Sequence, residues 1–198
     1  MNRLDATRAL VECAGDAPII ASLGHPAYDL FAAGDRPSNF YTWGSMGLAS
    51  SIGLGLALGR PGLRVFVVDG DGSLLMNLGS LATIGWTAPP NLVLIVWDNE
   101  EYATTGGQQT ATAQGADVEA AARAMRFPGT VTVRDARELR VAIRRAGVEP
   151  GPWMINAKVA ESVPQVRPPL DCVFIKQRFM AAIGNPEAAT RGSTGGTT

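Results

Sequence analysis

The chain has 198 residues, of which 46% are hydrophobic and 18% charged, and its formal net charge at pH 7 is −1. A chain of this length forms one domain with a sizeable core, and its balanced charge argues against binding to nucleic acid or to an anionic membrane. The charged fraction is below the roughly 25% of an average soluble chain, which indicates that a partner covers part of the surface.

The predicted elements alternate between helices and short buried strands. In chain order they are helix 4–13, strand 18–23, strand 39–43, helix 45–59, strand 63–68, helix 74–84, strand 92–97, helix 117–125, a strand near residue 131, helix 135–146, strand 153–157 and helix 174–183. This alternation predicts an α/β fold with three layers (α/β/α), in which a mainly parallel sheet lies between helices. We expect residues 1–183 to form one domain. Residues 184–198 lack aromatic and large aliphatic side chains, so we expect a disordered tail there.

The two cysteines, Cys13 and Cys172, lie far apart and outside any metal-binding motif. We therefore expect neither a disulfide framework nor a zinc site. Charged residues interrupt the first sixteen positions, and no apolar run reaches 18 residues. These features predict a cytoplasmic protein without a membrane-spanning segment.

Polar residues follow two consecutive buried strands. Gly70, Asp71 and Gly72 come after one strand, and Asn99 comes after the next. Because a right-handed crossover makes the carboxyl ends of these strands neighbours, Asp71 and Asn99 can share one ion. A carboxylate, an amide oxygen and a backbone carbonyl suit a Mg²⁺ ion that also binds phosphate oxygens. Ser73 is expected to begin a helix whose free N–H groups favour an anion, so the segment predicts a metal–diphosphate site.

Two other functions for this segment fail on spacing. An EF-hand loop beginning at Asp69 needs glycine at its sixth position and glutamate at its twelfth, where this chain has Leu74 and Ser80. A nicotinamide-binding GxGxxG motif needs a third glycine where Leu75 stands. A tight turn with a solvated aspartate remains the simplest alternative to a site.

The segments NFYTWGSMGLASSIGLGLAL, DGDGSLLMNLGSLATIG and DNEEYATTGGQQT together resemble the thiamine-diphosphate-dependent enzymes. In particular, GDG is followed about 26 residues later by a DN pair, which is similar to the cofactor motif of these enzymes. Within this group the resemblance is to the sulfopyruvate and phosphonopyruvate decarboxylases, and it extends from about residue 5 to residue 183. It implies the fold of the pyrophosphate-binding domain, with thiamine diphosphate and Mg²⁺ as cofactors.

The resemblance also implies ligands. Mg²⁺ would be held by Asp71, Asn99 and the main-chain carbonyl of Glu101. The full implied cofactor-binding set is Gly24, His25, Gly44, Ser45, Met46, Gly70, Asp71, Gly72, Ser73, Asn99, Glu101 and Tyr102. Within this set, Gly44, Ser45 and Met46 match the stretch that holds the aminopyrimidine, and Met46 is the candidate wedge under the bent cofactor. A flexible core filler is the alternative for this methionine.

Two further features leave alternatives open. His25 is the single histidine, and it is a candidate for contact with phosphate or substrate, for an inert loop position, or for proton transfer. The polar, glycine-containing loop at 102–109 either closes over the cofactor or stays solvated. No GxSxG motif is present, and one histidine does not allow a separate catalytic triad.

The resemblance implies a missing partner. In the family, a glutamate from a separate pyrimidine-binding domain activates the cofactor, and this chain has only the pyrophosphate-binding domain. No catalytic residue is therefore assigned here, and we expect an α subunit that carries the glutamate, in an α2β2 or larger assembly. The implied function is the β subunit of a carboxy-lyase acting on a small anionic 2-oxo acid, such as 3-sulfopyruvate or 3-phosphonopyruvate. The alternatives are a carboligase subunit resembling acetolactate synthase and a non-catalytic cofactor-binding or regulatory subunit.

Overall fold

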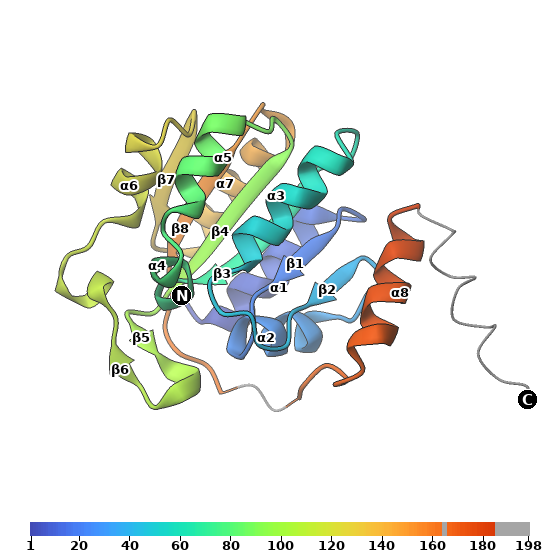
Figure 1. Cartoon of the computed structure of the whole chain (residues 1–198). Helices are drawn as coiled ribbons and strands as arrows, with labels where there is room; N and C mark the ends of the chain where they lie inside the picture. The colour runs from blue at the N-terminus through green and yellow to red at the C-terminus, as the bar shows by residue number, and fades with distance from the viewer. Residues whose placement is uncertain (164–165, 185–198) are drawn as a thin grey trace, which may run out of the picture.

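A computed structural model describes residues 1–163 and 166–184, and the expected tail lies outside the described residues apart from Gly184. Its centre is a six-stranded parallel sheet (Figure 1). In spatial order the strands are β2 (Asn39–Tyr41), β1 (Ile19–Ala21), β3 (Val65–Gly70), β4 (Leu92–Asp98), β8 (Trp153–Lys158) and β7 (Gly129–Val133). The prediction of a parallel α/β sheet is confirmed.

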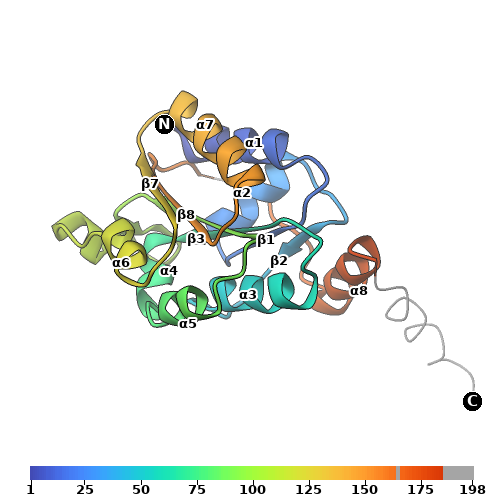
Figure 2. The same cartoon turned by 90° about the horizontal axis from the view of Figure 1, so that it is seen from above.

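Helices cover both faces of the sheet, which confirms the three layers (Figure 2). One layer contains α1 (Arg3–Ala14), α2 (His25–Ala33) and α7 (Ala136–Val148), and the other contains α3 (Ala49–Gly59), α4 (Asp71–Met76), α5 (Ser80–Thr87) and α6 (Val118–Ala124). Each layer packs on its own cluster of buried side chains from the sheet. The last helix, α8 (Cys172–Ala182), lies against the edge strand β2, where the Phe40 and Phe179 rings are 5.2 Å apart. No helix in the described ranges is long and apolar enough to cross a bilayer.

The sequence explains the best-defined elements. In α7, Leu139, Ala142, Ile143 and Ala146 are buried at helical spacing. Asp135 caps this helix by accepting the N–H groups of its first turn. Every residue of β4 is buried, as expected for a central strand of a parallel sheet that is covered on both faces.

Several predicted boundaries are wrong. The predicted helix at 74–84 is two helices, α4 and α5, and α4 begins at Asp71 rather than at Ser73. The predicted helix at 45–59 begins at Ala49 because a turn with positive φ at Gly44, Ser45 and Gly47 precedes it.

Two elements were not predicted at all. Helix α2 starts at His25 and has only nine residues, of which Ala27 and Leu30 are buried in the core and Phe31 packs against it. The polar loop after β4 contains a short hairpin, β5 (Glu101–Tyr102) and β6 (Gln108–Gln109), joined by the 3₁₀ helix η1 (Ala103–Thr105), and a second 3₁₀ helix follows it, η2 (Ala111–Gln114).

The strand order places a crevice at one point of the sheet. The chain leaves β1 for the edge strand β2 and then returns to β3 on the other side of β1. The connection through α2 and the connection through α3 therefore diverge onto opposite faces of the sheet. In open α/β sheets ligands bind outside the carboxyl ends of the strands at such a point.

Candidate active site

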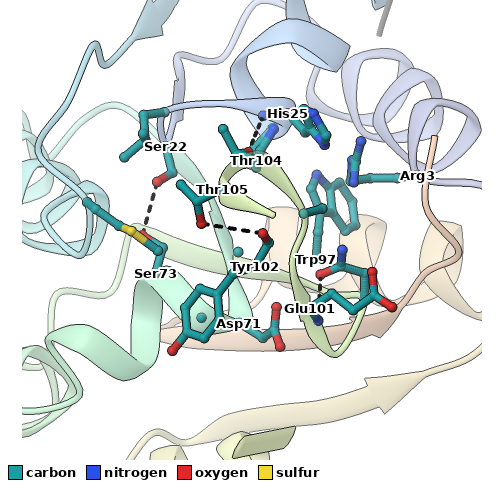
Figure 3. A pocket seen from close by; sticks show the side chains of 17 residues that line it. Arg3, Ser22, His25, Asp71, Ser73, Trp97, Glu101, Tyr102, Thr104 and Thr105 are labelled. Atoms are coloured by element: carbon teal, nitrogen blue, oxygen red, sulfur yellow. Dashed lines mark hydrogen bonds between the residues drawn. The ribbon is translucent and has the colours of Figure 1, made fainter. Parts of the chain in front are cut away.

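A cavity of about 70 Å³ lies at the carboxyl ends of β1, β3 and β4, where the two connections diverge (Figure 3). The residues that line it include His25, Met46, Gly70, Asp71, Gly72, Ser73, Asn99, Glu101 and Tyr102 from the predicted cofactor set. The other three members of that set, Gly24, Gly44 and Ser45, do not line the cavity. The fold thus brings most of the predicted set, from four separate segments of the chain, to one place.

Asp71 begins α4 at the end of β3, and its carboxylate is buried. Its Oδ2 accepts hydrogen bonds from the hydroxyls of Thr110 and of Thr112, the latter at 2.7 Å. Burial raises the pKa of Asp71, and the two hydroxyls offset this effect only in part. A cation beside the carboxylate would favour its ionised form. No local pattern in the sequence identifies the two threonines, because they reach Asp71 only through the fold of the loop after β4.

Asn99 lies beside a carboxylate that sequence analysis missed. Its Nδ2 donates to Oε2 of Glu161 at 2.8 Å, and Oε1 of Glu161 lies 2.8 Å from Nδ1 of His25. Arg3 donates to Oε2 of the same carboxylate at 2.7 Å. Burial alone would raise the pKa of Glu161, but the hydrogen bond and charge of Arg3 outweigh it and lower that pKa.

Arg3 joins the amino-terminal helix to the site. It is 2% exposed, and its Nε donates to Oδ2 of Asp29 at 2.6 Å. Backbone pairing between Arg3 and Ala160 holds the start of α1 beside the segment after β8. Sequence reasoning could not find Arg3 or Glu161, because these residues are 158 positions apart and belong to no local motif.

The β5–β6 hairpin packs directly on two glycines. A Cβ atom on Gly72 would lie 2.4 Å from Cε1 of Tyr102, and one on Gly24 would lie 2.4 Å from Oγ1 of Thr104. Both positions therefore require glycine while the hairpin is in place.

The cavity is small. A volume of about 70 Å³ holds a few water molecules, whereas small-molecule pockets measure about 300 Å³ or more. The hairpin forms part of the cavity wall, so a larger ligand needs these side chains to move.

Met46 reaches the cavity from a rigid turn. The flanking residues Gly44, Ser45 and Gly47 have φ values of +74°, +58° and +84°. Ser73 Oγ accepts the N–H of Gly47 at 2.9 Å, and Asn77 Nδ2 donates to the carbonyl of Gly47 at 2.9 Å. Gly44 and Ser45 therefore shape the turn, while Met46 is the member of this group that lines the cavity.

The donor set fits a Mg²⁺–diphosphate group. No cluster of three or more His, Cys, Asp or Glu side chains that could hold a metal occurs among residues 1–163 and 166–184. The cavity wall offers the buried carboxylate of Asp71, the exposed carboxylate of Glu101, the amide of Asn99 and the backbone of Gly70 and Gly72, beside the hydroxyl of Ser73. Mg²⁺ is commonly held by one or two carboxylates together with phosphate oxygens. The glycines provide the space that a phosphate needs to approach the backbone, once the hairpin has moved.

Comparison with known proteins gives a consistent result. Residues 27–157 match the family described as "Thiamine pyrophosphate enzyme, C-terminal TPP binding domain". The chain is 42% identical over 185 residues to "Sulfopyruvate decarboxylase subunit beta" of Methanocaldococcus jannaschii, covering 91% of this chain and 96% of that protein. It is 37% identical over 185 residues to "Phosphonopyruvate decarboxylase" of Streptomyces viridochromogenes, covering 92% of this chain and 46% of that protein.

A solved structure also resembles the fold. A putative thiamin diphosphate-dependent enzyme from Mycobacterium smegmatis superposes with a TM-score of 0.72 at 23% identity, over 82% of this chain and 32% of that one. At this identity the likeness concerns the fold alone. It supports the α/β fold described above.

Proposed function

The chain belongs to the family of thiamine pyrophosphate enzymes, and from that premise we propose that it is the β subunit of a two-component 2-oxo acid decarboxylase. The family match spans more than half of the chain. The Methanocaldococcus jannaschii relative is named as a β subunit, and the alignment covers nearly all of both proteins. The substrate class we propose is a short 2-oxo acid with a second anionic group, as in 3-sulfopyruvate or 3-phosphonopyruvate.

We propose that Asp71, Asn99 and the main-chain carbonyl of Glu101 hold Mg²⁺. Gly72 and Ser73 then contact the diphosphate. Bound thiamine diphosphate supplies the electron sink that accepts the charge left when a 2-oxo acid loses carbon dioxide. Because Asp71 is buried, its carboxylate would attract a bound cation more strongly than an exposed carboxylate would.

Met46 and His25 have different proposed roles. Met46 projects from a turn that is anchored to α4, so it can support the bent cofactor from below. His25, the single histidine, is placed beside Glu161 at the cavity wall and is our candidate for contact with an anionic group of cofactor or substrate. The rigid turn favours orientation of the cofactor as the contribution of Met46.

The second wall of the site is assigned to an α subunit. Near the cavity, Asp71 is hydrogen-bonded to two threonines, and Glu161 contacts Arg3, His25 and Asn99. The remaining lining carboxylate, Glu101, is exposed, and its main-chain carbonyl is already assigned to the proposed metal site. We therefore propose that the activating glutamate belongs to the pyrimidine-binding domain of the partner, in an α2β2 or larger assembly. The low charged fraction of this chain supports a permanent partner.

One observation carries the proposal: Asp71, Gly72 and Asn99 meet at the carboxyl ends of β3 and β4, in a chain with the family's cofactor-binding domain. The test is to purify the chain with its α subunit and measure carbon dioxide release from sulfopyruvate, phosphonopyruvate and pyruvate. We expect turnover of an anionic substrate that requires Mg²⁺, thiamine diphosphate and both subunits. Condensation products in place of aldehydes would assign a carboligase instead, and cofactor binding without turnover of any acid would indicate a regulatory subunit.

A further inference from the structure

The surface made by α3, α5 and the part of α4 that follows Asp71 carries no charged side chain. Residues 44–59 and 72–90 contain no Asp, Glu, Lys or Arg. Large apolar side chains are nevertheless exposed there: Leu58 is 53%, Met76 62% and Trp86 85% accessible. A face that remains in water normally has charged residues, so this composition is typical of a permanent interface.

The opposite helical layer provides the contrast within the same molecule. In α7, five of the thirteen residues are charged, and α1 contains four charged residues among twelve. An ion pair between Arg140 and Glu12 joins these two helices at the surface. The layer of α1 and α7 is therefore a normal solvated face, and the lack of charge is local to the α3–α4–α5 face.

The exposed residues of this face lie on neighbouring helices. Helices α3 and α5 run next to each other (Figure 1), and Oγ of Ser50 is 2.9 Å from Oγ of Ser80 where they begin. On α3, Ser51, Gly55 and Leu58 are exposed at i, i+4 and i+7, and thus follow one side of the helix. Trp86 is exposed in the last turn of α5. A partner helix or sheet can therefore contact both helices at once.

The face is continuous with the rim of the cavity. Met46 lines the cavity, and two residues later Leu48, which is 44% exposed, leads into α3. Asp71 lines the cavity at the start of α4, and Met76 is exposed at the end of the same short helix. Gly47 donates its N–H to Ser73 Oγ and accepts from Asn77 Nδ2, and these two hydrogen bonds join the two connections.

We propose that the α3–α4–α5 face docks the subunit that completes the cofactor pocket, with Trp86 and Leu58 as apolar anchors. This inference rests on the proposed function, which requires such a subunit. A partner that buries Leu48 and Met76 must also lie at the mouth of the cavity, where the second wall is needed. A second copy of this chain would present the same residues and would not add that wall. Buried aromatic residues carry much of the binding energy in protein interfaces, which is why Trp86 is the first position to test.

The test compares charge insertions on the two helical layers in the complex with the α subunit. Trp86→Glu and Leu58→Glu place a charge in the proposed interface, and Val141→Glu and Val148→Glu on α7 are matched controls at positions 61% and 79% exposed. Size-exclusion chromatography with light scattering measures assembly, and thermal unfolding of the isolated chain checks folding. We expect each interface variant to weaken association by at least tenfold and the controls to assemble like the wild type. Excess α subunit should restore turnover in the interface variants by mass action.

Four other results would contradict either the docking face or the proposed function. Normal assembly of both interface variants would overturn the docking face, while decarboxylation by the wild-type complex would leave the proposed function intact. A homodimer of this chain that Trp86→Glu separates, with the heteromer unaffected, would assign the face to a second copy and overturn the inference. A wild-type complex that assembles but releases no carbon dioxide would contradict the proposed function, and the assembly data would still decide the docking face. Failure of the wild-type chain to bind any α subunit would reject both.

Discussion

The side-chain amide of Asn99 donates to the carboxylate of Glu161 at 2.8 Å, and this contact joins the end of β4 to the segment after β8. Because the amide nitrogen faces a carboxylate, the oxygen is the atom that Asn99 offers to a cation. Arg3 holds Glu161 in place and lowers its pKa, so the acceptor remains ionised. Glu161 therefore positions a proposed metal ligand without contacting the metal site itself.

Loss of Glu161 should weaken metal binding without unfolding the chain. Outer-shell partners of metal ligands typically contribute about 10–100-fold to affinity. We expect Glu161→Ala to raise the Mg²⁺ concentration needed for thiamine-diphosphate binding by at least about tenfold, and Glu161→Gln, which keeps one acceptor oxygen, to have a smaller effect. Tryptophan fluorescence of the assembled enzyme during Mg²⁺ titration measures this.

The matched control for Glu161 is Glu149→Ala. Glu149 forms an ion pair with Arg145 on the far side of the molecule and has no role in the site. This control should titrate like the wild type. If Glu161→Ala also did so, Asn99 would not need its partner, and the positioning role would be wrong.

Replacing Asp71 should weaken cofactor binding without lowering the stability of the cofactor-free chain. Burial raises the pKa of this carboxyl, which means that the folded chain without a cation disfavours the ionised form. We expect Asp71→Asn to unfold at the same temperature as the wild type or higher in the absence of cofactor. The same variant should lose thiamine-diphosphate affinity by more than about 100-fold, beyond the range of outer-shell changes. Calorimetric titration and thermal unfolding test the two halves, and unchanged affinity would reject Asp71 as the ligand.

The Tyr102 ring should limit entry of the cofactor. It packs on the backbone of Gly72, and the cavity beneath the hairpin holds a few water molecules only. We expect Tyr102→Ala to speed association of thiamine diphosphate several-fold in stopped-flow fluorescence, because the hairpin then opens at lower cost. Gln108→Ala, a change at an exposed position of the same hairpin, is the control. Equal association rates for all three proteins would mean that the cofactor enters by another route.

The fold was predictable wherever local patterns are strong. Buried strands such as β3 and β4 appear as continuous apolar runs, and the glycines around Asp71 mark the strand end that faces a ligand. The same reasoning missed α2, because this helix has only nine residues and follows the end of β1 after a few residues. It also merged α4 and α5, since residues 77–79 carry no strong helix-breaking signal beyond one glycine.

Of the candidate site, only the residues that directly follow a predicted strand could be predicted from the sequence. Asp71 and Asn99 follow their strands directly, so the geometry of a parallel sheet brings them together. Arg3, Thr110, Thr112 and Glu161 come from distant segments, and their contacts depend on how the loops close over the sheet. No spacing rule in one sequence identifies such residues.

The last prediction concerns Asp69, which is fully buried and whose Oδ2 has no hydrogen-bond partner among the described residues. Burial raises the pKa of Asp69 to about 6, from 3.8 for an exposed aspartate. Between these two values the folded chain binds more protons than the unfolded chain, so stability decreases as the pH rises. At about 1.4 kcal/mol per pKa unit, ionised Asp69 should lower the free energy of unfolding of the cofactor-free chain by about 3 kcal/mol above pH 6.

Asp69→Asn removes this titration and keeps the shape of the side chain. Urea unfolding of the cofactor-free chain in EDTA, repeated from pH 4 to pH 7, gives the free energy of unfolding of both proteins. The stability of the variant relative to the wild type should increase across this range, because only the wild type has to ionise a buried carboxyl. Other groups titrate in both proteins and cancel in the difference. Parallel curves would show that Asp69 keeps an ordinary pKa, which requires a hydrogen-bond donor or a water molecule at Oδ2.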